Sequence, residues 1–243
     1  MKIKNLNLNG KEVHICVPIT SINKENIIED VKSAVQSKAE VIEWRVDCFE
    51  GAKDIEQVID ILKEIQINLG DKVLLFTYRT SNEGGNGNLE TSEYMLLLKT
   101  AILSKLVDIV DIELLLGDTI INSIVNHAHM CNVKILISNH DMDSTPRYDV
   151  IENRINLMYE KGADIAKVSY MPKNEEDVKV LYQVAKDLNK DRPYLLISMG
   201  ELGKVTRLEA KKLGSCFTFA SLNGKVSAPG QISVEEICKT LKK

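Results

Sequence analysis

The chain has no long apolar run and no excess of positive charge. Its 31 lysines and arginines are outnumbered by 35 aspartates and glutamates, which gives a formal net charge of -4. Surfaces that bind nucleic acid are usually basic, so this balance argues against a nucleic-acid partner. No stretch approaches the roughly 20 apolar residues of a membrane-spanning helix, and the polar start at 1–10 lacks the apolar centre of a signal peptide. We therefore expect a cytoplasmic protein with no membrane partner.

The cysteines and histidines also lack the paired spacing of a disulfide framework or a metal site. The 5 cysteines are odd in number and scattered, which indicates reduced thiols and not a disulfide framework. They are Cys16, Cys48, Cys131, Cys216 and Cys238. His127 and His129 are too close in a predicted helix to share a face, where neighbours are three or four apart. With neither a GxGxxG turn nor a phosphate-binding P-loop, we expect no metal and no cofactor.

Short β-rich runs alternate with amphipathic helical segments along the whole chain. The predicted strands are Val13–Ile19, Val41–Val46, Val73–Tyr78, Val107–Ile112, Val133–Ser138, Asp164–Ser169, Tyr194–Ser198 and Cys216–Ala220. The predicted helices lie near 25–37, 54–68, 90–105, 118–130, 147–161, 174–189, 205–213 and 233–242. Such alternation produces right-handed βαβ units and a parallel sheet. Eight units without a linker predict one (β/α)8 TIM barrel domain over 1–243, a fold of about 250 residues.

A β-hairpin is predicted ahead of the first barrel strand. Alternating apolar residues lie on both sides of Asn9-Gly10, a dipeptide that is strongly preferred in two-residue hairpin turns. We expect the chain to turn there, and we expect the hairpin to close the end of the barrel away from the site. The first barrel strand then runs into Pro18-Ile19-Thr20 without the Gly-rich turn of a doubly wound sheet, which favours the barrel.

Charged residues occur at the ends of nearly all the predicted strands, where α/β barrels carry their chemistry. Glu43 and Arg45 share a face because they are two positions apart, and His140 follows the fifth strand. An ion pair and a capping histidine would explain these residues as well. Lys167 is harder to explain structurally, because it stands between apolar neighbours in a central strand. Further polar residues at these ends are Arg79, Glu83, Asp111, Glu113 and Ser198.

A buried lysine and a nearby histidine suit proton removal next to a carbonyl group. Lysine has an ordinary pKa of about 10.4, and burial or the cations Arg45, Arg79 and Arg207 would lower it. The free amine of Lys167 would form an imine with a ketone, and the imine would acidify the neighbouring C–H bond. His140 has the right ordinary pKa to accept that proton and to return it to a departing hydroxyl group.

Six motifs, in order and spread over almost the whole chain, resemble type I 3-dehydroquinate dehydratase. They are Glu43-Trp44-Arg45, Arg79-Thr80 with Glu83-Gly84-Gly85, Ser138-Asn139-His140-Asp141, Ala166-Lys167 with Met171-Pro172, Ser198-Met199-Gly200 with Arg207, and Ser227-Ala228-Pro229-Gly230-Gln231. The resemblance implies dehydration of 3-dehydroquinate to 3-dehydroshikimate in the shikimate pathway. It also implies a homodimer. Two departures, Thr206 in place of serine and Ile197 in place of methionine, affect the packing around the substrate.

The resemblance also implies a role for each site residue. Lys167 forms the imine, His140 moves the protons and Glu83 lies beside that histidine. The matches to substrate-binding residues are Glu43, Arg45, Arg79, Met199, Arg207, Phe219, Ser227, Ala228 and Gln231. Among these, Arg207 with Ser227 and Gln231 would bind the carboxylate, and we place Arg207 at the start of a helix, where the dipole favours anions. The loop 221–231 would close over the substrate as a lid.

Two other functions use parts of the same pattern. An aldolase that forms a Schiff base would share Lys167, but it would usually bind a phosphate near the last two strands. A non-catalytic sensor derived from a dehydratase could lose Lys167 or His140, and this chain retains both. The carboxylate-binding pattern around Arg207 therefore favours the dehydratase.

Overall fold

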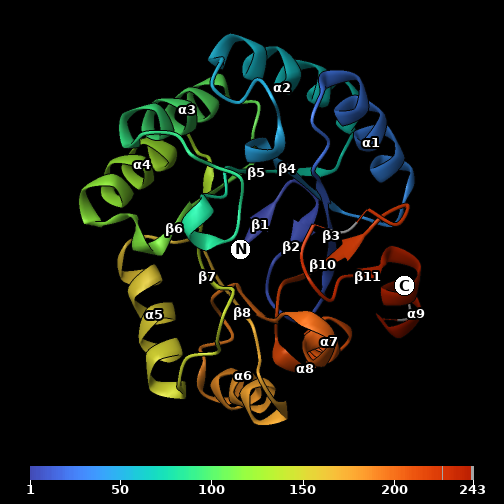
Figure 1. The fold of residues 1–243 in the computed structure, drawn as a ribbon, viewed down its shortest axis with the longest axis vertical. Coiled ribbons are helices and arrows are strands. Elements are labelled where there is room, and N and C mark those ends of the chain that lie inside the picture. Colours follow the sequence, from blue (N-terminus) through green and yellow to red (C-terminus); the bar gives the residue numbers. More distant parts are fainter. Residues whose placement is uncertain (226, 242–243) are drawn as a thin grey trace.

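A curled parallel sheet forms the centre of the computed structural model, which describes residues 1–225 and 227–241 (Figure 1). The strands pair in the order β11-β10-β3-β4-β5-β6-β7-β8-β9. They are β3 (His14–Ile19), β4 (Val41–Arg45), β5 (Val73–Thr77), β6 (Ile109–Glu113), β7 (Lys134–Asp141), β8 (Ile165–Tyr170), β9 (Tyr194–Ser198), β10 (Phe217–Ser221) and β11 (Ile232–Ser233). The sheet closes where the Cys216 N–H donates to the Tyr194 carbonyl at 2.9 Å. The predicted (β/α)8 barrel is confirmed.

Helices surround this barrel as an outer ring in Figure 1. They are α1 (Lys24–Gln36), α2 (Ile55–Leu69), α3 (Thr91–Ser104), α4 (Asp118–Met130), α5 (Tyr148–Glu160), α6 (Glu175–Asp187), α7 (Gly200–Leu208), α8 (Ala210–Leu213) and α9 (Val234–Leu241). Short 3-10 turns follow three strands, η1 (Val46–Cys48), η2 (Ser81–Glu83) and η3 (Leu114–Leu116). Asn23, Asp54 and Asn174 cap α1, α2 and α6 by accepting N–H groups of the first turn. In the part of the chain that the structure describes, no helix is long and apolar enough to cross a membrane.

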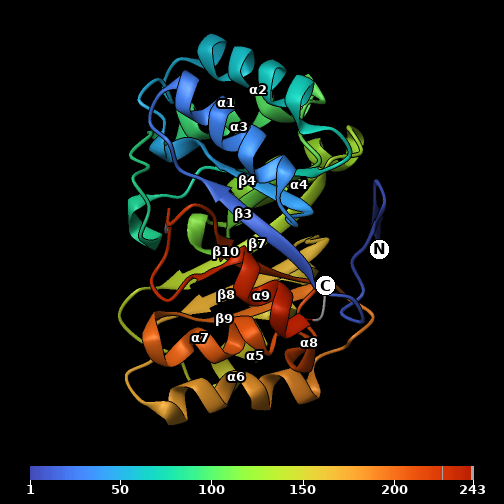
Figure 2. The ribbon, with the colours of Figure 1, turned by 90° about the vertical axis from the view of Figure 1, so that its right-hand side faces the viewer.

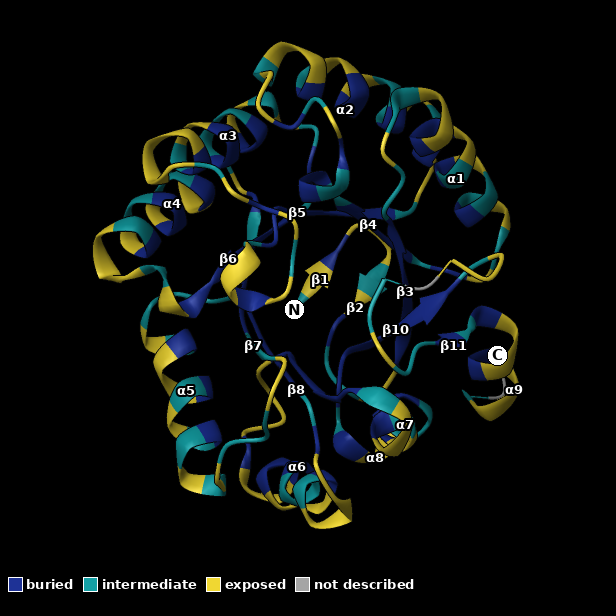
Figure 3. Cartoon of the chain, in the orientation of Figure 1, coloured by how far each residue is buried: buried dark blue, intermediate teal, exposed yellow. Residues whose placement is uncertain are grey.

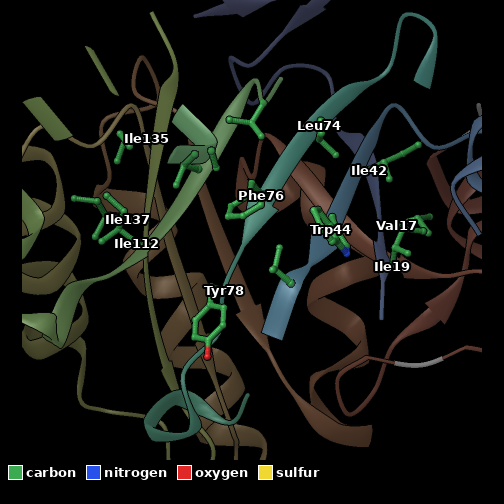
Figure 4. Close-up of a cluster of buried hydrophobic side chains, with 14 of the residues drawn as sticks. Val17, Ile19, Ile42, Trp44, Leu74, Phe76, Tyr78, Ile112, Ile135 and Ile137 are labelled. Atoms are coloured by element: carbon green, nitrogen blue, oxygen red, sulfur yellow. The ribbon is translucent and has the colours of Figure 1, made fainter. Parts of the chain in front are cut away.

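Strand alternation divides the core into two layers. One set of side chains packs between the sheet and the helices, where the rings of Trp44 and Phe76 meet edge to face at 5.7 Å (Figure 4). The opposite faces of the strands point into the barrel, and at their amino ends Val41, Val73 and Ile109 form a separate apolar cluster. The buried strands and the exposed outer faces of the helices are distinguished in Figure 3. The inner cluster fills the amino end of the barrel and leaves its carboxyl end for polar groups.

The N-terminal hairpin covers the amino end of the barrel, as expected, but it turns elsewhere. Strands β1 (Lys2–Ile3) and β2 (Leu6–Asn7) pair antiparallel around Lys4, whose φ is 47°. The predicted turn at Asn9-Gly10 was wrong, because the residues after it join the barrel and cannot also pair with the hairpin. Leu8 instead packs into the inner cluster. Figure 2 places this hairpin on the side of the molecule opposite the β10–β11 loop.

The segment after β9 also differs from the prediction. A helix was expected over 205–213, but α7 already begins at Gly200, and α8 continues after Glu209. Gly203 makes the earlier start possible, because a Cβ atom there would lie 2.3 Å from the Ser198 carbonyl group. Arg207 therefore lies in the last turn of α7, and not at a helix start. A helix dipole does not favour an anion at that end, so this reason for anion binding by Arg207 was wrong.

Candidate active site

One cavity of about 140 Å³ at the carboxyl ends of the strands is lined by all the residues to which the family resemblance gave a catalytic or substrate-binding role. They are Glu43, Arg45, Arg79, Glu83, His140, Lys167, Met199, Arg207, Phe219, Ser227, Ala228 and Gln231. Gly84, Met142, Ser169, Ile197 and Pro229 complete the lining. Residues from distant parts of the chain meet here because parallel strands end at the same edge of the barrel.

Lys167 lies in the wall of this cavity with 5% of the residue exposed. Its Nζ atom is 4.4 Å from the centre of the Phe219 ring and 3.8 Å from Oδ2 of Asp111. Burial lowers the pKa of Lys167 from its ordinary value, although the negative charges of Glu43 and Asp111 oppose the shift. The amine of Lys167 therefore loses its proton more easily than a lysine in water.

His140 is held by Glu83. The carboxylate oxygen Oε2 of Glu83 accepts the backbone N–H of His140 at 3.0 Å and lies 2.8 Å from the imidazole Nδ1. Burial lowers the pKa of His140 well below its usual value, and the cations Arg79 and Lys167 add to this effect. With Nδ1 directed at Glu83, the other ring nitrogen, Nε2, is the one available as a base for a proton in the cavity.

Glu83 itself is a buried carboxyl group among other carboxylates. Burial raises the pKa of Glu83, with the charge of Glu113 acting in the same direction and Arg79 opposing it. The amide of Asn139 donates to Oε1 at 3.0 Å and also favours the ionised form. Glu83 and His140 therefore form a coupled acid–base pair, whose proton content depends on the donors around Glu83.

Arg79 is the centre of a buried charge network. Its guanidinium donates to Asp111 Oδ2 at 2.6 Å and to Glu113 Oε1 at 3.0 Å, and Glu83 Oε2 lies 3.6 Å away. Ser138 accepts from Arg79 at 2.9 Å and donates to Asp111 at 2.6 Å. These carboxylates raise the pKa of Arg79 although burial opposes them. The hydrogen-bonding capacity of Arg79 is thus largely used inside the protein.

The end of β4 supplies two further polar groups to the cavity. Arg45 binds Asp47 through two hydrogen bonds of 2.8 Å, from Nε and from Nη2. Asp47 also accepts the backbone N–H groups of Arg79 and Asn86, both at 3.1 Å, so it connects Arg45 to the loop after β5. Glu43 accepts the Thr77 hydroxyl at 2.9 Å. Arg45 is consequently held in place at one side of the cavity by a bidentate ion pair.

Arg207 also lines the cavity, but its hydrogen bonds go to backbone carbonyl groups, whereas those of Arg45 go to a carboxylate. The Arg207 guanidinium donates to the carbonyl oxygens of Ser198 at 2.7 Å and Pro229 at 3.1 Å, while its Nε has no hydrogen-bond partner among the residues that the structure describes. No carboxylate within residues 1–225 and 227–241 forms an ion pair with it, and burial lowers its pKa to about 10. At neutral pH this is a buried cation without a counter-ion, which suits an anionic ligand.

The loop between β10 and β11 lies beside Arg207 and is held at two places. Ser227 and Gln231 bond to each other twice, through the Ser227 N–H and through its hydroxyl group, both at 2.9 Å. Lys225 donates to both carboxylate oxygens of Asp30 on α1, at 2.6 and 2.8 Å. The loop thus contacts α1 through Lys225 and contributes Ser227, Ala228, Pro229 and Gln231 to the lining of the cavity.

Sequence reasoning noticed Asp111 and Glu113 at a strand end but did not assign them to the site. The structure places both against Arg79, and Asp111 also against Lys167. An Asp-x-Glu pair at the end of a buried strand was the available signal, since two carboxylates on one face need a cation nearby. Asp47 and Asn139 were missed as well. Asp47 pairs with Arg45 two positions before it, whereas the partners of Asn139 lie on the loop after β5, on α5 and on β8.

A (β/α)8 barrel with a buried lysine, a His–Glu pair and an unpaired buried arginine defines a class of enzyme that can activate a carbonyl compound carrying an anionic group. Known proteins agree with this description. The family Type I 3-dehydroquinase matches residues 15–243. The chain is similar to the 3-dehydroquinate dehydratases of Clostridioides difficile strain 630, with 40% identity over 99% of this chain and 95% of the relative, and of Bacillus subtilis strain 168, with 35% identity over 99% and 95%. The chain belongs to the type I 3-dehydroquinase family.

Solved structures of this family have the same fold over the whole chain. The type I 3-dehydroquinate dehydratase of Clostridium difficile, solved with covalently modified comenic acid, superposes with a TM-score of 0.95 at 39% identity, covering 100% of this chain and 96% of that one. The enzyme from Geobacillus kaustophilus superposes with a TM-score of 0.95 at 32% identity, covering 100% and 95%. The barrel and its connections are therefore those of the family.

Proposed function

We propose that this chain dehydrates 3-dehydroquinate to 3-dehydroshikimate, a step of the shikimate pathway, through an imine on Lys167. The observation that carries the proposal is the buried amine of Lys167 in the same cavity as His140 and Arg207. Burial favours the neutral amine, which is the form that attacks a carbonyl carbon. The family membership supplies the substrate, and the covalent modification in the C. difficile structure favours covalent chemistry in such a site.

The proposed reaction balances as the loss of one water molecule. The Lys167 amine adds to the ketone, takes up one proton and releases water to form a protonated imine, which acidifies the neighbouring C–H bond; the final hydrolysis returns that proton. Nε2 of His140 takes that proton, and the electron pair moves toward the imine nitrogen to give an enamine. The enamine then expels the hydroxyl group, which leaves as water with the proton from His140. Hydrolysis of the imine consumes one water molecule and restores the lysine.

The substrate groups have counterparts in the cavity. We assign the carboxylate to Arg207, with Ser227 and Gln231 turning from each other to the ligand as the lid closes. Glu43, Arg45 and Arg79 supply the polar and charged side for the hydroxyl groups. Met199, Phe219 and Ala228 supply contact area around the ring. Because Arg79 is held by carboxylates, its contribution is mainly to the charge of the site.

Borohydride trapping tests this proposal directly. Wild-type protein is incubated with 3-dehydroquinate, reduced and digested, and the peptides are analysed by mass spectrometry. We expect a ligand-sized adduct on Lys167 that is absent from Lys167→Ala. Turnover without an adduct would exclude the imine. If wild-type protein shows no turnover and forms no adduct, the dehydratase function is excluded. Lys173, a lysine outside the cavity lining, serves as the control, since Lys173→Ala should retain both the adduct and the activity.

We also propose that residues 1–243 act as one barrel domain, as a homodimer and in the cytoplasm. One continuous sheet through the barrel supports the single domain. The five free thiols are in keeping with a reducing compartment. The homodimer is inferred from the family resemblance alone. Size-exclusion chromatography with light scattering measures the mass directly, and a mass near the 27.3 kDa of one chain would contradict the dimer.

A further inference from the structure

We propose that Arg154 and Tyr170 are positioning residues, which fix the amide of Asn139 and thereby keep the Glu83–His140 pair in the form that accepts a proton. Neither Arg154 nor Tyr170 lines the cavity. Arg154 lies on α5 and Tyr170 ends β8, while Asn139 precedes His140 on β7. The inference deepens the proposed function, because it concerns the base of the same reaction.

The carbonyl oxygen of the Asn139 side chain receives two donors. The Tyr170 hydroxyl donates to Oδ1 at 2.8 Å, and Arg154 Nη1 donates to the same atom at 2.9 Å. Arg154 Nη1 also lies 3.3 Å from the Tyr170 hydroxyl, and its guanidinium carbon is 5.9 Å from the centre of the Tyr170 ring. Burial raises the pKa of Tyr170 to about 12, so its hydroxyl keeps its proton and acts as a donor.

These two donors determine which way the amide faces. An oxygen accepts both bonds, whereas the amide nitrogen in that place would oppose a cation and a hydroxyl proton. The NH2 group of Asn139 must therefore face Glu83, where it donates to Oε1 at 3.0 Å. A reversed amide would bring an oxygen against the Glu83 carboxylate. Arg154 and Tyr170 thus act on Glu83 through one buried side chain, since Asn139 is 1% exposed.

The orientation of Asn139 influences the proton content of the pair, because burial raises the pKa of Glu83 and the hydrogen bond from the amide opposes that shift. A hydrogen bond donated to a carboxylate favours its ionised form, and ionised Glu83 can accept only from the imidazole. Nδ1 of His140 then carries the proton, and Nε2 presents a lone pair to the cavity. With the amide reversed, Glu83 would be protonated, and its O–H group would donate a hydrogen bond to an Nδ1 atom that carries no hydrogen. Nε2 would then carry a hydrogen and could not act as a base.

Two substitutions test this inference. Arg154→Met and Tyr170→Phe each remove one donor to Asn139 and keep most of the side-chain volume. We expect kcat to fall about tenfold in Arg154→Met, the value of one hydrogen bond coupled to a charge, with KM within about twofold. Arg154→Lys should recover most of the loss, because an ammonium group can also donate to Oδ1. The matched controls are Arg147→Met, just before α5, and Tyr148→Phe at its first residue, which should leave kcat unchanged.

The pH profile separates positioning from general damage. Losing a donor to Asn139 weakens the hold on the amide that donates to Glu83, which raises the apparent pKa of the pair. Activity should therefore be lost at higher pH on the acid side, by about half a pH unit or more. Tyr170→Phe should shift the profile in the same direction without any change of charge. If Arg154 acts through Glu83, Arg154→Met should cost less than about twofold in a Glu83→Gln background. Independent, multiplicative losses in the double variant would overturn the inference.

NMR of 15N-labelled histidine gives a reading that does not depend on turnover. The His140 signals are assigned by their loss in His140→Ala. Wild type should show the hydrogen on Nδ1, and Arg154→Met should shift the population toward Nε2. A tautomer unchanged by Arg154→Met and Tyr170→Phe would refute the inference even if activity falls. Absence of dehydration by wild type would refute the proposed function instead, and the tautomer measurement would still stand.

Discussion

Two arginines are buried in the same cavity in opposite electrostatic surroundings. Arg79 is surrounded by carboxylates, with Asp111 at 2.6 Å and Glu113 at 3.0 Å, and its pKa is raised. Arg207 donates only to carbonyl oxygens among the residues described, and its pKa is lowered. Both side chains are almost fully buried, so solvent access does not distinguish them. The difference lies in the counter-charge.

This difference indicates that Arg79 is a cation paired within the fold and that Arg207 is a cation suited to pair with a ligand. Burying a charge without a partner costs several kcal/mol, a cost that folding accepts at Arg207 and offsets at Arg79. A ligand carboxylate would offset it at Arg207 by forming a bidentate pair. At Arg79 the Asp111 and Glu113 carboxylates already occupy that role. The side of the cavity around Arg79 is therefore neutralised without a ligand, whereas the proposed role of Arg207 would require a bound anion.

The largest effect is expected from Arg79→Met. It would leave Asp111, Glu113 and Glu83 buried without their cation, and breaking such a network costs about 3–5 kcal/mol of unfolding free energy. For a chain of this length that is a drop in Tm of roughly 10 °C, measured by scanning calorimetry. Burial already raises the pKa of Glu83, and without the opposing charge of Arg79 it would rise further. The variant then regains stability as pH falls toward about 4 and loses it as pH rises.

A pH-independent change in Tm would show that Arg79 does not balance these carboxylates. Surface substitution Arg147→Met is the control, because the side chains of Arg147 and Asp149 are 82% and 58% exposed in their ion pair. Such a pair contributes at most about 1 kcal/mol, so its loss should shift Tm by a few degrees or less at any pH.

Arg207→Met should have the reverse signature. Removal of an unpaired buried charge should not lower Tm, but loss of the carboxylate partner should reduce kcat/KM about 100-fold, mainly through KM. A steady-state assay and calorimetry on one preparation measure both quantities. A dicarboxylate such as malonate should raise Tm of wild type and not of Arg207→Met. A large loss of Tm in Arg207→Met would mean that Arg207 stabilises the fold, and the contrast with Arg79 would fail.

Periodicity predicted the barrel because strand and helix positions depend on local patterns. All eight predicted barrel strands lie within a few residues of those in the structure, since each is a short buried run that only one period explains. The predicted bounds were wrong where tertiary contacts determine the position of a turn or of a helix start. Asn9-Gly10 carries the better local turn signal, but burial of Leu8 against the barrel moves the hairpin turn to Lys4. Gly200 and Gly203 resemble a loop in sequence, yet they allow α7 to begin close to β9.

The site was predictable as a set of residues and not as a network. Strand ends indicate which side chains meet, because parallel strands end together, and this placed Lys167 and His140 correctly in one cavity. The hydrogen-bond and ion-pair partners of each side chain often lie on other strands, and the separation of two residues in the sequence does not reveal such contacts. No sequence pattern therefore indicated that Arg154 donates to Asn139, which in turn donates to Glu83. Both arginines were predicted to bind substrate, and their counter-charges appear only in three dimensions.

A moderate effect is expected from Glu83→Gln, which removes one negative charge from the balanced side and keeps the shape. His140 would lose the anion that orients it, so kcat should fall about tenfold, while His140→Ala should nearly abolish turnover. Slow imine formation on Lys167 should survive in His140→Ala, and borohydride trapping measures it. Equal losses of kcat in the two variants would contradict this division of roles. It would place Glu83, and not His140 alone, at the proton-transfer step.

The smallest effect is expected from Lys225→Met, at the lid beside the unpaired cation. Lys225 is half exposed in its ion pair with Asp30, and such pairs contribute at most about 1 kcal/mol. Loss of the pair should favour the open lid and raise KM about two- to threefold, with kcat and Tm unchanged. Because exposed pairs are screened by salt, 1 M NaCl should reduce the difference from wild type. A KM effect that persists in high salt would assign Lys225 a contact with substrate instead of a contact that holds the lid.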